Sequence, residues 1–271
     1  MARQDNRTGG GRVAPTTQER SLMGWDITYH PFGVNEVRDL YFAGVDTPDA
    51  VAAMAERFQV PEVDRPRLEF IFERARDTDP ELPFPQTHAF FMAITAGFLR
   101  PYWYIRDGAL SFLYDDPEFR PFFSDWTDLV PESRRREGLD TLLLCNYCGG
   151  VYLTPEALAD LREAARTRAP VAEKLEALFS GGRLDLFWSA VDHALDNGLG
   201  LLEAAEVIEP NPVDVRKTRC YARTENCDPA GPILYQRDYL AEMDRLRRKK
   251  AEEDARKGVV RRLLDRIVYR P

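Results

Sequence analysis

The chain has 271 residues, of which 44% are hydrophobic and 30% are charged, so it holds enough apolar side chains for one large or two small domains. This composition excludes a collagenous, low-complexity or wholly disordered protein. The net charge is -8, and no apolar run approaches the roughly 18 to 20 residues of a membrane span, so we expect a soluble, cytoplasmic protein.

The predicted elements begin after an N-terminal arm. Residues 1–22 contain three consecutive glycines and few apolar groups, and we expect them to be disordered. Strict alternation of apolar and polar residues predicts a half-buried strand over 25–30 that ends at Pro31. Helical patterns follow over 34–41, 47–58, 64–76, 86–99, 154–168, 170–180, 184–197 and from about 233 into the C-terminal tail.

Strands are fewer and lie in separate clusters. Asp107-Gly108 stands between two strand-like runs, 102–106 and 109–113, and predicts a hairpin because its turn favours positive φ. Further short strands are expected over 142–144, 151–153 and 199–208. We therefore predict an α+β, mostly helical single globular domain over 23–236, followed by a charged amphipathic helical tail over 237–271.

The first strand carries the residues with the clearest catalytic pattern. Asp26, Thr28 and His30 share one strand face, and alternate residues on a face lie roughly 6 to 7 Å apart. Asp26 would orient the imidazole, His30 would act as a general base, and Glu203 would add a second carboxylate, as in a hydrolase. The alternative is a polar outer face at a sheet edge, since no nucleophile or oxyanion motif accompanies these residues.

The four cysteines predict a metal site. Cys145 and Cys148 are separated by two residues and followed by two glycines, a spacing typical of one half of a zinc knuckle. Cys220 and Cys227 would complete a tetrahedron, although their spacing of six residues differs from that of a zinc ribbon. A redox pair and ordinary packed thiols remain alternatives for the same residues.

Charge is divided between an acidic body and basic ends. Residues 237–271 carry 12 basic and 7 acidic groups, and residues 1–22 carry four arginines and two acids, which leaves a net charge of -15 for 23–236. An acidic body disfavours nucleic acid and favours a protein partner with a basic surface. The alternative is that this charge only maintains solubility.

The tail adds an amphipathic stripe formed by Val260, Leu263, Leu264 and Ile267. Such a basic helix can dock on its own body, fit a partner's groove, or make weak contact with a membrane surface. Arginines are interleaved with acids and no aromatic platform accompanies them, so no nucleic-acid binding is expected.

Three stretches carry a resemblance: residues 23–31, 149–156 and 201–212, which read MGWDITYHP, GGVYLTPE and LLEAAEVIEPNP. Over most of 23–240 the chain resembles an uncharacterised bacterial protein family, which brings no activity or site residues. Acidic proteins of this sort include immunity partners of secreted toxins. Since nucleotide-binding loops and nucleophile elbows are also absent from the sequence, the favoured interpretation is a non-enzymatic interaction protein, and the alternative is a hydrolase-like enzyme using Asp26, Thr28 and His30.

Overall fold

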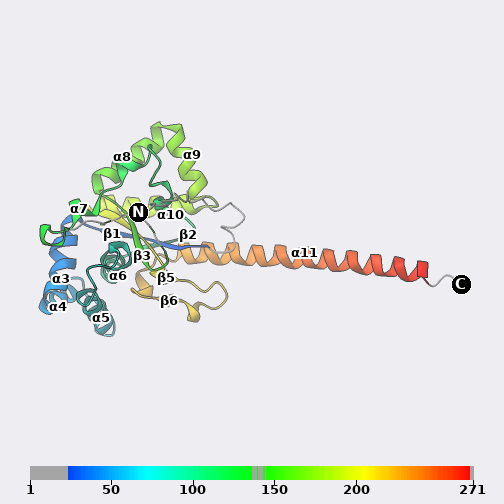
Figure 1. Cartoon of the computed structure of the whole chain (residues 1–271), viewed down its shortest axis with the longest axis horizontal. Helices are drawn as coiled ribbons and strands as arrows, with labels where there is room; N and C mark the ends of the chain where they lie inside the picture. The colour runs from blue at the N-terminus through cyan, green and yellow to red at the C-terminus, as the bar shows by residue number, and fades with distance from the viewer. Residues whose placement is uncertain (1–23, 136–138, 140–142, 144, 269–271) are drawn as a thin grey trace, which may run out of the picture.

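The computed structural model describes residues 24–135, 139, 143 and 145–268, with side chains described as far as Lys257. A four-stranded antiparallel sheet lies at its centre, and helices cover both faces (Figure 1). The strand order is β2-β1-β4-β3, in which the strands are β1 (Asp26–Phe32), β2 (Trp103–Arg106), β3 (Cys148–Leu153) and β4 (Gly200–Ala205). A second, two-stranded ribbon is made of β5 (Ile208–Glu209) and β6 (Arg219–Cys220).

Helices make up most of the remaining structure, which confirms the α+β, mostly helical class. The α-helices are α2 (Val34–Glu36), α3 (Ala43–Asp46), α4 (Pro48–Arg57), α5 (Arg65–Arg76), α6 (His88–Leu99), α7 (Trp126–Leu129), α8 (Pro155–Thr167), α9 (Ala169–Leu178), α10 (Arg183–Asp196) and α11 (Ala230–Val268). A π-helical turn, η1 (Val37–Phe42), joins α2 to α3. Single 3-10 turns are η2 (Phe84–Gln86), η3 (Leu110–Leu113), η4 (Arg120–Phe122), η5 (Glu132–Arg134), η6 (Val215–Lys217) and η7 (Thr224–Asn226).

The sheet divides the apolar interior into two layers. One layer contains Phe32, Tyr104 and Leu202 from the sheet and is covered by α6 with the helices of the N-terminal third. The other contains Tyr29, Ile105 and Leu201 from the sheet, and is covered by α8 and α10. Because both faces of the sheet are covered, successive side chains of one strand point into different cores.

The first strand is central, and this corrects the expectation of a half-buried edge strand. β1 pairs with β2 on one side and with β4 on the other, so its polar face is as buried as its apolar face. Pro31 does not end the strand, because it lies within β1 opposite Leu201. Sequence alternation alone indicated a polar outer face, but α6 covers that face.

The predicted hairpin at Asp107-Gly108 is also wrong. Asp107 does adopt the positive φ that the turn requires (63°), but the chain beyond it forms the 3-10 turn η3 and no second strand. The partner of β2 is instead β1, from the beginning of the described chain. The predicted strand over 142–144 lies outside the described residues, apart from Leu143, and so do the N-terminal residues 1–22.

The two glycines after Cys148 have a packing role. β3 lies so close to α6 that a Cβ atom at Gly149 would sit 2.5 Å from the Cβ of Ala89 and 2.8 Å from its carbonyl carbon. We expect Gly149→Ala to lower the free energy of unfolding by about 2–3 kcal/mol, because backbone must move to admit the methyl group. Urea denaturation monitored by circular dichroism would measure this loss.

Gly33→Ala is the matched control for that substitution. The nearest atoms to a Cβ at Gly33 are side-chain atoms of Glu36 and Leu199 at 3.2 to 3.4 Å, which can yield by small rotations. We expect the control to cost well under half as much. Equal losses for the two variants would contradict the close approach of β3 and α6.

The longest element, α11, extends away from the body (Figure 1). Its first turns pack against β2, whereas the side chains of residues 244–257 are all exposed. As far as Lys257 the tail therefore does not pack back onto its own body, which was one of the arrangements expected for it. The stripe at Val260, Leu263, Leu264 and Ile267 lies outside the described side chains. Among the described residues, none of the helices combines the length and apolar character needed to cross a membrane.

Candidate functional site

His30 is fully buried and pairs with Thr28, not with Asp26. Its Nε2 lies 2.8 Å from the Thr28 hydroxyl, and its ring stacks on Tyr102 with centroids 4.8 Å apart. Burial lowers the pKa of His30 to about 3, so the imidazole is neutral at physiological pH. The other ring nitrogen, Nδ1, has no hydrogen-bond partner among the described residues. A base without access to solvent or substrate is poorly placed for proton transfer.

Asp26 lies at the opposite end of β1 from His30. They are four positions apart, and that length of extended strand spans about 13 Å. The Asp26 carboxylate accepts hydrogen bonds from the hydroxyl of Tyr104 (2.6 Å) and from Nη1 of Arg106 (2.5 Å), both on β2. Asp26 and His30 therefore lie on one face of the strand, as their alternate spacing predicts, but they are not in contact.

Glu203 lies on the other face of the sheet from His30. In the pairing of β1 with β4, Glu203 is opposite Tyr29, and His30 is opposite Leu202. Since paired residues point to the same side of a sheet and neighbours point to opposite sides, the backbone separates Glu203 from His30. The structure consequently does not assemble the predicted combination of Asp26, His30 and Glu203.

Glu203 instead caps a 3-10 turn inside the second core. One of its carboxylate oxygens accepts a hydrogen bond from the backbone N–H of Ser111 (3.0 Å), in the first turn of η3. Beside it, the hydroxyl of Tyr29 accepts from the N–H of Leu110 (3.1 Å) and donates to the carbonyl of Gly108 (2.8 Å). Burial raises the pKa of Glu203 from its ordinary value of 4.5 to about 8. The carboxyl group thus serves the fold and is held away from solvent.

The cysteines are not gathered into one cluster. Cys148 donates its thiol to the carbonyl of Cys145 (2.7 Å), whereas Cys220 lies 3.3 Å from the hydroxyl of Tyr102. Burial raises the pKa of the Cys227 thiol to about 12, which disfavours a thiolate there at neutral pH. Within the described part of the chain, no three residues among His, Cys, Asp and Glu are grouped closely enough to hold a metal ion. The predicted four-cysteine zinc site is therefore not assembled.

A polar pocket lies where α11 leaves the body, and we call it the base pocket. It has a volume of about 640 Å³ and is lined by Asp26, Arg106, Glu209, Pro210, Asn211, Pro212, Lys217, Arg219 and Tyr235. Arg106 stands between the Asp26 carboxylate and the Tyr235 ring, whose centroid lies 5.1 Å from the guanidinium carbon. The pocket thus presents both signs of charge without a nucleophile and general-base pair.

Glu206, at the edge of this region, is conformationally unusual. Its φ of 66° lies in the left-handed region, which non-glycine residues seldom adopt, and its N–H donates to the carbonyl of Asp26 (2.7 Å). Burial, followed by the charges of Asp26 and Glu209, raises the pKa of Glu206 to about 7. A positive φ and a raised pKa in one residue mark this region as the most distinctive polar site among the described residues.

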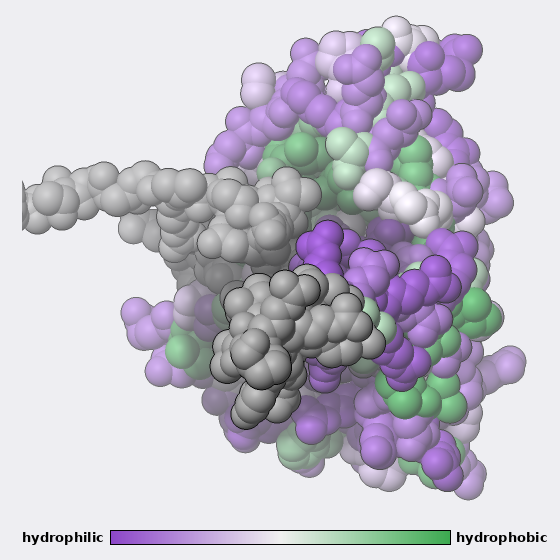
Figure 2. All heavy atoms as spheres, turned by 90° about the vertical axis from the view of Figure 1, so that its right-hand side faces the viewer, coloured by the Kyte–Doolittle hydropathy of each residue, from purple (hydrophilic) through white to green (hydrophobic). Residues whose placement is uncertain are grey.

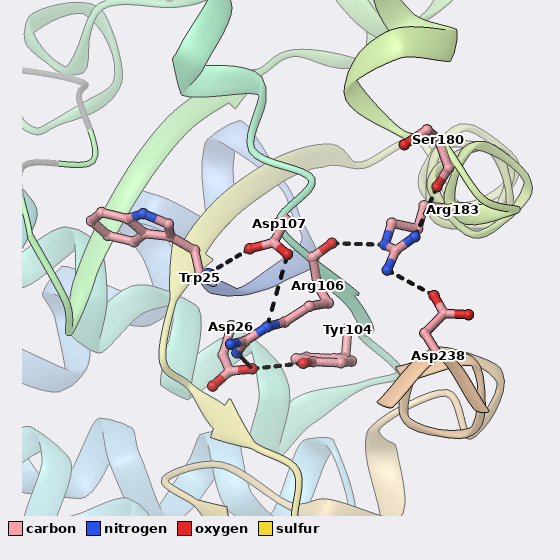
Figure 3. Close-up of polar contacts among 8 residues, drawn as sticks. All are labelled: Trp25, Asp26, Tyr104, Arg106, Asp107, Ser180, Arg183 and Asp238. Atoms are coloured by element: carbon pink, nitrogen blue, oxygen red, sulfur yellow. Dashed lines mark hydrogen bonds and ion pairs between the residues drawn. The ribbon is translucent and has the colours of Figure 1, made fainter. Parts of the chain in front are cut away.

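A network of hydrogen bonds and ion pairs fixes the direction of α11 (Figure 3). Arg183, at the start of α10, donates to the carbonyls of Arg106 (2.9 Å) and Ser180 (2.9 Å) and forms an ion pair with Asp238 of α11 (2.9 Å). At Gly231, a Cβ atom would lie 2.1 Å from the carbonyl oxygen of Tyr104, so the first turn of the helix lies directly on β2. The base of α11 is therefore held rigidly by the body.

Most residues of this region were not singled out from the sequence. Asp26 was predicted as a catalytic residue, but Tyr104, Arg106, Arg183 and Tyr235 belong to segments far apart in the chain. The single sequence signal was the run of carboxylates from Glu203 to Glu209 before Pro210. That run did not indicate which cations would face it.

Comparison with known proteins gives no match: no family model fits the chain, and neither a curated protein nor a solved structure is significantly similar to it. The resemblance of residues 23–240 to an uncharacterised bacterial family stays a prediction.

Proposed function

We propose that this chain is a non-enzymatic protein-interaction module whose docking element is helix α11. The observation that carries the proposal is the exposure of residues 244–257, a run of helix that contacts nothing else among the described residues. Helices in proteins gain most of their stability from tertiary packing, so a partner that packs against this extended helix would stabilise it. We call the part of α11 from Tyr239 to Lys257 the arm.

The rigid base of α11 supports the same function. Asp238 is tied to Arg183, and the ring of Tyr235 lies against Arg106, so the arm leaves the body in one direction. Because the helix is already held in one direction, it loses less conformational entropy when a partner binds. The apolar side chains Leu240 (50% exposed) and Leu246 (46% exposed) give the arm contact points for a partner.

The surface of the body favours the arm over an apolar patch on the body as the binding element. On the face shown in Figure 2, hydrophilic residues predominate and apolar residues form small separate patches. Residues 23–236 have a net charge of -15, which suits a partner with a basic surface and disfavours nucleic acid. The immunity-type version is a different interaction protein, in which the acidic body and not the arm covers a basic toxin domain.

The hydrolase alternative has less support. His30 and Glu203 are both fully buried and lie on opposite faces of the sheet, and His30 pairs with Thr28 rather than with Asp26. A general base must reach the proton that it removes, directly or through one water molecule. This geometry does not favour catalysis by Asp26, His30 and Glu203.

Affinity capture of the tagged chain from a lysate of its source organism, at low and at high salt, tests the proposal. We expect one stoichiometric partner for the wild-type chain and at least about a tenfold lower yield for Leu246→Lys, because a charge would replace an apolar contact of the arm. Val63→Lys is the matched control, since Val63 is exposed (82%) on the body. It should capture the partner as the wild type does.

Two results would contradict the arm as the docking element. Capture of no partner at low salt by a chain that is also monomeric in solution would remove the proposal altogether. A partner that is retained by Leu246→Lys but released at high salt would assign binding to the acidic body, as the immunity-type version requires.

A further inference from the structure

The arm has a heptad pattern. Residues spaced alternately by four and three positions lie along one side of the helix, and they are Tyr239, Met243, Leu246, Lys250, Glu253 and Lys257. The same spacing continues in the sequence at 260, 264 and 267. Of these nine positions, the first three and the last three are apolar, and apolar residues repeated every 3.5 positions are the pattern of a left-handed coiled coil. Its centre is charged, which is unusual for such a seam and restricts how a second helix can lie against it.

From this pattern we infer that the arm binds a second copy of this chain, with the two α11 helices antiparallel. The inference rests on the proposed function and names its partner. We align the two helices so that Lys250 lies opposite Glu253 of the partner subunit, and Glu253 therefore lies opposite the partner's Lys250. The two charged layers at the centre of the seam are then both attractive. Polar residues at seam positions are known to fix register and orientation in coiled coils at some cost in stability.

The flanking positions fit the same alignment. Leu246 lies opposite Lys257 of the partner subunit, whose aliphatic stem can cover it. Beside the seam, Arg247 lies near the partner's Asp254. In the monomer Arg247 pairs with Asp244 of its own helix at 3.3 Å, but both side chains are more than 60% exposed, so that ion pair is weak and can be exchanged.

One unfavourable contact limits the affinity of the pair. Lys249 lies beside Arg256 of the partner subunit in this alignment, and the two positive charges repel each other. We therefore expect dimerisation in the micromolar range, where a small number of contacts changes the measured dissociation constant markedly.

The charge of the body disfavours a parallel arrangement. Parallel helices would place Lys250 opposite the partner's Lys250 and would bring two bodies of net charge -15 to the same end of the seam. Antiparallel helices place the bodies at opposite ends, about 40 Å apart along an overlap of roughly 26 residues from 239 to 264, well beyond the screening length at physiological salt. The basic tail, with net charge +5 over 237–271, then approaches the acidic body of the other copy.

Sedimentation velocity on the full chain tests the inference through charge swaps. We expect a concentration-dependent dimer for the wild-type chain. Lys250→Glu and Glu253→Lys should each raise the dimer dissociation constant by about tenfold or more, because each places like charges opposite one another in two layers. The double variant Lys250→Glu with Glu253→Lys should restore the wild-type value, since the swapped charges again attract.

Lys249→Glu is the matched control, because it makes the same change in charge one residue away. In the antiparallel pair it removes the repulsion by the partner's Arg256, so it should tighten dimerisation. In a parallel pair Lys249 would attract the partner's Asp254, and the same substitution would weaken dimerisation. The direction of this effect therefore reports the orientation of the helices.

Cross-linking checks the orientation independently. A mixture of the Leu246→Cys and Lys257→Cys chains should form a dimer with a short bismaleimide, and Leu246→Cys alone should form little more than the wild-type chain, whose four native cysteines set the background. Efficient cross-linking of Leu246→Cys to itself would overturn the antiparallel alignment.

A monomeric wild-type chain at all accessible concentrations would also overturn the inference. The proposed function would survive that result if lysate capture still returned a different protein that Leu246→Lys fails to bind. If capture returned nothing as well, both would fail.

Discussion

Glu203→Gln is expected to stabilise the protein strongly at alkaline pH. The folded state raises the pKa of Glu203 from 4.5 to about 8, so folding at high pH must bury a charge or take up a proton. Over this shift the cost amounts to about 5 kcal/mol, at 1.36 kcal/mol for each unit. Glutamine carries no charge and can still accept the hydrogen bond from the N–H of Ser111.

The sign of the pH dependence follows from the direction of that shift. Below about pH 4.5 the group is protonated in both the folded and unfolded states and costs nothing, whereas between pH 4.5 and 8 only the folded state holds the proton. The free energy of unfolding of the wild-type chain should therefore fall as pH rises through this window. Glu203→Gln should lose most of that fall, so the two chains should differ least near pH 4.5 and most above pH 8.

Urea denaturation at a series of pH values measures this difference directly. Glu225→Gln is the control, since Glu225 is an exposed carboxylate on η7 and its substitution should leave the pH profile unchanged. Parallel profiles for the wild-type chain and Glu203→Gln would contradict the burial of a protonated carboxyl at this position.

Arg106→Met is expected to destabilise the protein by about 3 kcal/mol near pH 8, because it leaves the Asp26 carboxylate without its cation in a largely buried setting. Arg106 also lowers the pKa of Glu206, which burial, Asp26 and Glu209 together raise to about 7. Without the guanidinium, the carboxylates of Glu206 and Glu209 add to the repulsion of the Asp26 carboxylate above pH 7. The loss should be smaller near pH 5, where Glu206 is protonated.

Arg219→Met provides the comparison within the same pocket. The Arg219 side chain is 76% exposed and lies 4.0 Å from Glu209, a pair expected to contribute less than about 1 kcal/mol. Chemical denaturation of both variants at pH 5 and pH 8 would separate the two effects. Similar losses for Arg106→Met and Arg219→Met would argue that the contact of Arg106 with Asp26 is no stronger than a surface pair.

Helices with local end signals could be predicted closely. Thr154 followed by Pro155 marks the start of α8, where the threonine hydroxyl accepts a hydrogen bond from the N–H of Ala157 (3.2 Å). Thr47 and Pro48 likewise mark the start of α4, although the Thr47 hydroxyl donates to the carbonyl of Ala43 (3.2 Å) and does not cap the helix. Such signals depend on neighbours within one turn, and so the sequence is sufficient to find them.

The place of each strand in the sheet depends on partners far away in the chain. β1 pairs with β2 and β4, whose residues follow by about 80 and 175 positions, and nothing near residue 30 indicates that α6 will cover its polar face. This is why Asp26 and His30 were assigned to a common site, and why Glu203 was placed with them. The alternation of side chains along a strand gives the face on which a residue lies. It does not give the register between strands, which decides which side chains meet.

The pairing of β1 with β4 also bears on how the chain folds during synthesis. Asp26–Phe32 leaves the ribosome long before Gly200–Ala205, and translation at about 5–20 residues per second makes the first strand wait roughly 10–30 s for its central neighbour. During that interval its apolar residues and one unpaired edge are open to other chains. A central strand that is made first and completed late gives the fold a high contact order, so slow folding and a need for chaperone protection are built into its topology.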